Sequence, residues 1–366
     1  MSFISELESI RDDELCQQLE QTSVQDVQRI LAQSSLSMRD YLALLSPAGE
    51  ACIEDMAQCA HRRTVQHFGR TMQLFTPMYM ANYCENGCIY CGYSHYSDIH
   101  RLKLNASDIE AEAQNIRSTG LEHILLLTGE SYQHSPVSYI EDAIRIVAPL
   151  FSSVSIEVYS LTVHEYEQLV KAGLDGMTMF QETYNPILYE QLHPFGPKRD
   201  FQKRIDTPEF ACQGGVRTVN IGALMGLDDW RLEAYKTGLH ARYLMKQYPD
   251  VEIAVSTPRI RPCAVGYQPQ HPLRDIELVQ YILALRIAFP RIGIPLSSRE
   301  SPMMRNHLVK LGVTKMSAGV TTAVGGHTRG EDSNQFDISD NRSVAAMAAM
   351  IREQGYQPIF KDWQLL

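Results

Sequence analysis

From residue 73 to residue 318, short apolar segments alternate with longer segments that carry helical periodicity. The apolar segments have the length and composition of buried parallel strands. The expected strands cover residues 74–80, 123–128, 154–158, 176–180, 218–222, 251–255, 292–296 and 314–318. Eight strands that alternate with helices close a barrel, so the sequence predicts an α/β fold of the (β/α)8 TIM type.

One connection departs from this alternation. Residues 191–206 are rich in proline, glycine and charged side chains, and Pro208 follows them closely. Because proline is disfavoured inside a helix, this segment predicts a long loop before the fifth strand. Long loops at the mouth of a barrel commonly carry binding residues.

The segments on either side of the barrel predict further helices. Ser37 has the features of an N-cap, and residues 51–68 have helical periodicity. After the barrel, a polar segment at 319–333 leads to a helix at 343–353. The expected parts are an N-terminal helical cover (1–70), a barrel (71–320), and a C-terminal loop and helix packed on the barrel (321–366).

Three cysteines, Cys84, Cys88 and Cys91, follow the first expected strand in a C-x3-C-x2-C spacing. A short loop with three thiols and no fourth ligand at close spacing favours an iron-sulfur cluster with one open iron over a closed zinc site. A zinc site is the alternative, with His95 or His100 as the fourth ligand. A role in core packing is disfavoured, because asparagine and glycine residues are interleaved with the cysteines.

Cysteine usage and charge limit the setting in which the protein works. The eight cysteines cluster only in this loop, which favours a reducing compartment, and Cys52 and Cys59 are expected to be core residues. The sequence has no apolar run of membrane-spanning length and no leader-like start, so we expect a cytoplasmic protein with no membrane partner. A formal net charge of −10 argues against nucleic-acid binding.

The cysteine loop resembles the signature of the radical S-adenosylmethionine (SAM) enzymes, in which an aromatic residue, here Tyr90, precedes the third cysteine. Further motifs narrow this resemblance. They are Asn82-Tyr-Cys84, Tyr90-Cys91-Gly92-Tyr93-Ser94, Thr128-Gly-Glu130, Gln181-Glu-Thr-Tyr184, Pro258-Arg-Ile-Arg-Pro-Cys263, Ser298-Arg-Glu-Ser-Pro302 and Lys361-Asp-Trp363. Over residues 37–363 the sequence is similar to the 2-iminoacetate synthase family, the tyrosine lyases of thiamine-thiazole biosynthesis.

The resemblance implies two cofactors, a 4Fe-4S cluster and SAM. The cluster ligands that it implies are Cys84, Cys88 and Cys91. The SAM-binding residues that it implies are Tyr90, Thr128, Gly129, Glu130, Gln181 and Glu182. Among these, Glu182 is favoured for the ribose, because one carboxylate accepts hydrogen bonds from two vicinal hydroxyls.

The resemblance also implies the reaction. A 5′-deoxyadenosyl radical starts cleavage of the Cα–Cβ bond of L-tyrosine, which gives 2-iminoacetate (dehydroglycine) and 4-cresol. Arg259, Arg261 and Arg299 follow expected strands and are candidates for the tyrosine carboxylate, with Arg299 favoured because Ser317 ends the neighbouring strand. The implied partners are thiazole synthase and a flavodoxin- or ferredoxin-type reductant.

Several alternatives stay open at this point. The related lyases of hydrogenase maturation bind a second cluster through C-terminal cysteines, and here no cysteine follows Cys263. Biotin synthase needs further cluster ligands in the barrel, and the tyrosine-dependent deazaflavin synthases fit the later motifs less well. Outside this superfamily, the alternative is a non-catalytic iron-sulfur or zinc protein.

Overall fold

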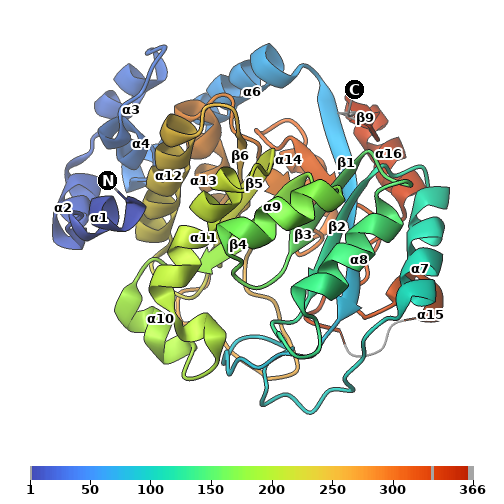
Figure 1. Cartoon of the computed structure of the whole chain (residues 1–366). Helices are drawn as coiled ribbons and strands as arrows, with labels where there is room; N and C mark the ends of the chain where they lie inside the picture. Colours follow the sequence, from blue (N-terminus) through green and yellow to red (C-terminus); the bar gives the residue numbers. More distant parts are fainter. Residues whose placement is uncertain (1, 331–333, 362–366) are drawn as a thin grey trace.

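A ring of parallel strands forms the centre of the molecule and helices surround it (Figure 1). The computed structural model describes residues 2–330 and 334–361. Its barrel strands are β1 (Thr71–Ala81), β2 (His123–Thr128), β3 (Ser153–Glu157), β4 (Gly176–Glu182), β5 (Thr218–Ala223), β6 (Glu252–Val255), β7 (Pro295–Leu296) and β8 (Lys315–Ser317). These eight strands confirm the predicted α/β barrel.

The strands follow the order β6-β5-β4-β3-β2-β1-β8-β7, and every pairing along it is parallel. A bridge between Ala254 and Gly293 joins the two ends of this series. Two backbone hydrogen bonds support it, from Val255 N to Gly293 O (2.9 Å) and from Gly293 N to Ile253 O (3.1 Å). Because the barrel closes, the carboxyl ends of all its strands meet at one mouth.

Helices follow most of the strands and cover the outside of the barrel (Figure 1). They are α7 (Ala106–Ser118), α8 (Val137–Val147), α9 (Val163–Ala172), α10 (Pro186–Leu192), α11 (Phe201–Gln213), α12 (Trp230–Gln247), α13 (Asp275–Ala288) and α14 (Pro302–Leu308). Side-chain caps fix several of their starts. Thr162, for example, accepts from the Glu165 backbone N–H, and Glu165 accepts in return from the Thr162 N–H (2.7 Å).

The prediction of a long loop at 191–206 is wrong. The segment holds a short 3-10 turn, Pro197–Arg199, and the first turns of α11, which the Asp200 carboxylate caps by accepting from Lys203 N (2.9 Å). Pro208 lies inside α11, where it removes one backbone hydrogen bond. Burial of the apolar face of α11 against β4 and β5 outweighs that loss.

The N-terminal helices pack beside α12 and α13 (Figure 1). They are α1 (Phe3–Glu8), α2 (Asp12–Gln21), α3 (Val24–Leu31), α4 (Met38–Leu44), α5 (Pro47–Ala51) and α6 (Ile53–Phe68). The buried Tyr41 hydroxyl donates to the Ala234 carbonyl (2.9 Å), and Gln280 donates to the Leu44 carbonyl (2.8 Å). Cys52 and Cys59 are buried here, as predicted.

The C-terminal segment contains one element that the sequence did not predict. After α15 (Gly326–Arg329) and α16 (Val344–Glu353), strand β9 (Gln357–Ile359) pairs in parallel with the start of β1. It is only three residues long, too short for periodicity to reveal. Of the C-terminal motif quoted above, Asp362 and Trp363 lie outside the described residues, as do residues 331–333 of the polar segment.

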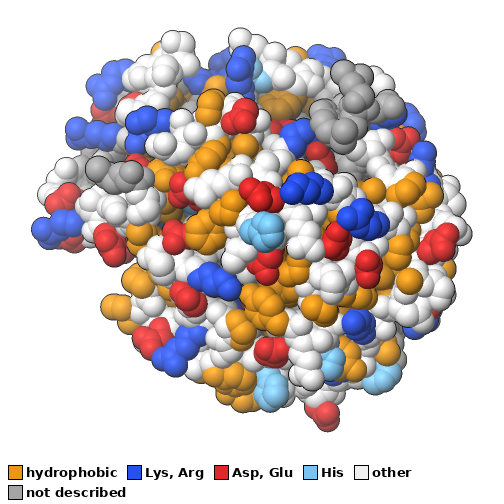
Figure 2. All heavy atoms as spheres, in the orientation of Figure 1, with side chains coloured by type: hydrophobic (Ala, Val, Ile, Leu, Met, Phe, Trp, Pro, Cys, Tyr) orange, Lys and Arg blue, Asp and Glu red, His pale blue; other side chains and the backbone are white. Residues whose placement is uncertain are grey.

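The surface carries both signs of charge. On the face shown in Figure 2, acidic and basic side chains are interspersed. Within the described residues, no helix combines the length and the apolar character that crossing a membrane requires.

Candidate active site

Two adjoining cavities lie at the mouth and inside the barrel. The outer cavity is bounded by the cysteine loop, and the inner cavity runs down the barrel from the carboxyl ends of the strands to their starts. The residues that line both cavities are Tyr79, Leu127, Glu157, Phe180, Arg299, Gln335 and Phe336. A ligand at this junction therefore contacts both spaces.

The cysteine loop leaves the end of β1 and is shaped by backbone hydrogen bonds. His95 N donates to Asn86 O (2.8 Å), and Gly87 N donates to Phe195 O (3.1 Å). A Cβ at position 87 would lie 2.4 Å from the Phe195 ring, so a larger residue there would displace that ring. Arg101 holds the two ends of the loop together by donating to the carbonyls of Asn82, Tyr93, Ser94 and Ser97.

Cys84, Cys88 and Cys91 all line the outer cavity and form no disulfide. Burial raises the pKa of each thiol, that of Cys91 to about 11. Coordination of iron removes these protons, as in other thiolate sites. Amide groups approach two of the sulfurs: Asn86 Nδ2 lies 3.7 Å from Cys84 Sγ, and Gln335 Nε2 lies 3.9 Å from Cys91 Sγ.

This arrangement fits a cluster better than a single zinc ion. Among the described residues, no three His, Cys, Asp or Glu side chains converge closely enough to hold one metal ion. His95 and His100, the alternative zinc ligands, are exposed. A four-iron cluster is larger than one ion, so its three thiol ligands surround a wider space and do not converge on one position.

The motif Thr128 to Glu130 lies directly against the cysteine loop and lines the same outer cavity. A Cβ at Gly129 would lie 2.3 Å from the Tyr83 carbonyl oxygen, so only glycine allows the close approach of this turn to the cysteine loop. The buried Thr128 hydroxyl has no hydrogen-bond partner among the described residues. A hydroxyl beside a carboxylate suits a ligand that carries an amino group, as SAM does.

Two buried ion pairs complete the outer cavity. Arg204 Nη1 lies 2.7 Å from Glu130 Oε1, and Lys198 Nζ lies 2.6 Å from Glu182 Oε1. Glu182 is in the left-handed backbone region with φ of 71°, at the point where the β4–β5 pairing shifts register. Lys198 and Arg204 were missed by the sequence analysis because they lie in the segment that was expected to be a loop.

The remaining predicted SAM residues differ in placement. Tyr90 lines the outer cavity and its hydroxyl is 2.7 Å from His193 Nε2. Gln181 is buried but lines neither cavity, and its side-chain nitrogen has no partner among the described residues. The structure thus brings together all of the predicted cofactor residues except Gln181.

The three candidate arginines differ in their hydrogen-bond partners and in the cavities that they line. Arg259 is held by Glu300 and by Asp275 (2.7 Å) and lines neither of the two cavities. Arg261 lines the outer cavity and donates to the Ser339 hydroxyl.

Arg299 lines both cavities and makes no ion pair among the described residues. Its guanidinium stacks 3.5 Å from the centre of the Phe336 ring, and its closest acceptor, Arg259 O, is 3.4 Å away. Burial lowers its pKa. Ser317 lines the inner cavity, and its buried hydroxyl also lacks a partner in the described chain. Arg299 therefore has donors available for an anionic ligand.

Glu157 is a site residue that sequence reasoning missed. It ends β3 and lines both cavities. Burial raises the pKa of this carboxyl to about 7, although nearby Arg299 acts in the opposite direction. A signal was present in the sequence, because Glu157, like Glu130 and Glu182, is an acidic residue near the carboxyl end of an expected strand.

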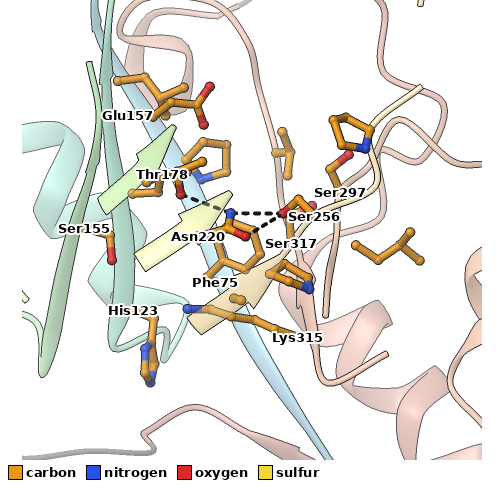
Figure 3. Close-up of a pocket in the computed structure, with 18 of the residues that line it drawn as sticks. Phe75, His123, Ser155, Glu157, Thr178, Asn220, Ser256, Ser297, Lys315 and Ser317 are labelled. Atoms are coloured by element: carbon orange, nitrogen blue, oxygen red, sulfur yellow. Dashed lines mark hydrogen bonds between the residues drawn. The ribbon is translucent and has the colours of Figure 1, made fainter. Parts of the chain in front are cut away.

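Small polar side chains line the inner cavity (Figure 3). Asn220 Nδ2 donates to the Thr178 hydroxyl (3.2 Å) and to the Ser256 hydroxyl (3.0 Å). Ser155 and Phe75 contribute to the same lining. Barrels of this type are usually filled by branched apolar side chains, so these smaller residues leave room for a ligand.

The comparisons with known proteins agree with this geometry. The Radical SAM superfamily matches residues 78–237, and the Biotin and Thiamin Synthesis associated domain matches residues 256–357. Together with the barrel and its three-cysteine loop, these matches define a radical SAM enzyme, a class that uses a 4Fe-4S cluster and SAM.

The sequence comparison is more specific. The chain is 39% identical over 340 residues to 2-iminoacetate synthase of Escherichia coli (strain K12), covering 92% of this chain and 90% of the relative. It is 38% identical, with the same coverage, to 2-iminoacetate synthase of Salmonella typhimurium. The chain belongs to the 2-iminoacetate synthase family.

Solved structures support the same fold. The FeFe-hydrogenase maturase HydG from Carboxydothermus hydrogenoformans superposes with a TM-score of 0.86 at 30% identity, over 98% of this chain and 83% of that one. Methylornithine synthase superposes with a TM-score of 0.74 at 19% identity, over 91% of this chain and 97% of that one, which shows the fold alone. The predicted radical SAM barrel is confirmed.

Proposed function

We propose that this protein is a 2-iminoacetate synthase, which cleaves the Cα–Cβ bond of L-tyrosine to 2-iminoacetate and 4-cresol. The observation that carries the proposal is Arg299, which is half-buried, forms no ion pair among the described residues, and lines both the inner cavity with Ser317 and the outer cavity with the three cysteines. An amino-acid carboxylate satisfies both side chains. The identity to 2-iminoacetate synthases supports the same substrate.

The cysteines and the outer cavity hold the two cofactors in this proposal. Cys84, Cys88 and Cys91 ligate the cluster, whereas Thr128 to Glu130, Glu182 and Tyr90 surround SAM. A reduced cluster held by these residues would supply the electron for cleavage of SAM to methionine and the 5′-deoxyadenosyl radical. The other steps depend on residues of this chain.

The chain positions the substrate and encloses it. Arg299 binds the carboxylate and Ser317 donates a second hydrogen bond, which fixes the amino-acid end at the junction of the cavities. Tyr79, Phe180 and Phe336 surround that junction with aromatic surface. Such walls exclude water and limit the hydrogen atoms that a reactive radical can reach.

The partners follow from the chemistry of the product and of the cluster. 2-Iminoacetate hydrolyses readily in water, so transfer to a thiazole synthase in thiamine biosynthesis protects it. A flavodoxin- or ferredoxin-type protein is a suitable source of the electron. Free thiols in all eight cysteine residues are compatible with a reducing cytoplasmic setting.

The proposal is tested by anaerobic reconstitution of the protein with iron and sulfide, followed by SAM, dithionite and L-tyrosine. We expect a brown protein that bleaches on reduction and forms 5′-deoxyadenosine and 4-cresol in equal amounts. SAM cleavage without 4-cresol, with tyrosine at saturating concentration, would show a radical SAM enzyme with another substrate. A colourless protein that retains zinc would remove the radical mechanism altogether.

A further inference from the structure

Glu157 differs from the other carboxylates of the two cavities, because it forms no ion pair among the described residues. Each of the others holds a cation. The pairs are Glu130 with Arg204, Glu182 with Lys198, Glu300 with Arg259, and Glu252 with Arg217. Glu157 is half-buried at the wall of both cavities, and a partly desolvated carboxylate without a partner is unfavourable, so its retention at this position suggests that a ligand supplies the missing cation.

Glu157 and Arg299 lie at the same level of the barrel. They are the charged members of the set of described residues that line both cavities. Each alters the pKa of the other, so their charges interact across the junction. In Figure 3, Glu157 lies at one end of the inner cavity, opposite the end that is lined by His123 and Lys315.

We propose that Glu157 binds the α-ammonium group of the substrate while Arg299 binds its carboxylate. This inference rests on the proposed function and deepens it. The two charged groups of an amino acid are attached to one carbon atom, so a carboxylate held by Arg299 places the ammonium group within reach of the same junction. Among the described residues that line both cavities, one unpaired cation and one unpaired anion match one zwitterion.

These contacts also give the site a stereochemical preference. Arg299 and Glu157 fix two substituents of the α-carbon, and the aromatic walls formed by Tyr79, Phe180 and Phe336 receive the third, the substituted benzyl group. Three fixed substituents distinguish the two enantiomers. We expect the Glu157→Gln substitution to reduce the preference for L-tyrosine over D-tyrosine.

The ionisation of Glu157 makes tyrosine binding depend on pH. The charged groups that face it are Arg299, Glu182, Arg204 and Lys198, and the Tyr79 phenol is also near. The pKa of Glu157 is about 7. Below that pH its carboxyl is protonated and loses its attraction for an ammonium group. Tyrosine affinity therefore falls as the pH falls through about 7.

The test measures ligand binding and not turnover. Reconstituted enzyme with SAM and no reductant is titrated calorimetrically with L-tyrosine and with its desamino analogue, 3-(4-hydroxyphenyl)propionate. In the Glu157→Gln variant we expect tyrosine affinity to fall about 10- to 100-fold and its pH dependence to flatten. The analogue should bind the variant as well as the wild type or better, because its binding no longer leaves a charged carboxylate unpaired.

Two controls make the result decisive. SAM affinity of the variant shows that the outer cavity is intact, and Glu277→Gln changes a buried acid that pairs with Arg274 and lines neither cavity, so neither ligand should be affected. Equal loss of affinity for both ligands, or unchanged tyrosine affinity, would overturn the assignment of Glu157. Failure of the wild type itself to bind tyrosine would instead overturn the proposed function.

Discussion

The outer cavity of this barrel and its junction with the inner cavity differ in whether their charged side chains are paired. In the outer cavity Glu130 and Glu182 are neutralised by Arg204 and Lys198, at 2.7 and 2.6 Å. At the junction with the inner cavity, Arg299 and Glu157 have no such partners among the described residues. The charges of the outer cavity are thus balanced without a ligand, whereas the charges at the junction gain their partners when a ligand binds.

This difference predicts which substitutions lower the stability of the protein and which lower only its affinity for ligands. A change in the outer cavity breaks an existing pair and leaves a buried charge behind, so it destabilises the protein as well as SAM binding. A change at the junction removes a charge that had no partner, so it weakens ligand binding and leaves the stability of the fold unchanged. The following substitutions test that division.

The largest effect is expected in the cysteine loop. Alanine at Cys84, Cys88 or Cys91 should abolish cluster assembly and formation of 5′-deoxyadenosine, because each thiol lines the outer cavity and is one of the three ligands that we propose for the cluster. Alanine at the buried Cys52 or Cys59 should leave both intact. Visible absorption and product chromatography are the measurements, and circular dichroism should show that the loop variants still fold. Equal damage from both groups of cysteines would contradict the ligand assignment.

Arg204→Met tests the outer cavity. The substitution leaves the largely buried Glu130 carboxylate with the Asn86 amide but without its cation, so we expect a loss of about 3 kcal/mol in the free energy of unfolding. Denaturant unfolding measures it, with the exposed pair Arg11 and Asp13 as a comparison in which Arg11→Met should change stability by less than about 1 kcal/mol. Equal effects at the two sites would show that the outer pair contributes nothing by its burial.

Arg299→Met tests the junction. We expect tyrosine affinity to fall by about 3 kcal/mol, more than a hundredfold, while unfolding free energy stays the same or rises. SAM cleavage should continue slowly and without 4-cresol. The control is Arg286→Met, because Arg286 is fully buried, is satisfied by the Gly312 and Pro290 carbonyls, and lines neither cavity. That variant should lose stability and keep tyrosine affinity.

The sequence predicted the barrel well because hydrophobic runs are local. The expected strand at 123–128 has the bounds of β2, since a continuous apolar segment between polar residues has little freedom to be anything else. The segment 191–206 was predicted wrongly, because tertiary burial of α11 overrode the local effect of Pro208. The short strand β9 depends wholly on its pairing with β1.

The site was predictable in part for similar reasons. Cys84, Cys88 and Cys91 are close in sequence, so their spacing alone indicated a shared ligand. Arg259 and Arg299 both follow strands, and only three-dimensional contacts show that Glu300 and Asp275 occupy the first and leave the second free for a ligand. Likewise, whether Glu157 has a partner is a question of distances between strands that sequence does not contain.

Ser317→Ala should have the smallest of these effects, and it tests whether a second hydrogen bond to the substrate carboxylate forms at the junction. Its buried hydroxyl lacks a partner in the described chain and lines the inner cavity, so a tyrosine carboxylate provides its acceptor. Loss of one hydrogen bond to a charged group should weaken tyrosine binding by about 1.5 kcal/mol, roughly tenfold.

Ser135 is the matched control for this hydroxyl. It too is buried without a side-chain partner in the described residues, but it lines neither cavity, so Ser135→Ala should leave tyrosine affinity unchanged. Calorimetric titration of both variants against the desamino analogue, which retains the carboxylate, separates the two ends of the zwitterion. Ser317→Ala should weaken that ligand as much as tyrosine, whereas Glu157→Gln should not. If Ser317→Ala affected tyrosine alone, the hydroxyl would face the amino group, and Arg299 would bind the carboxylate without it.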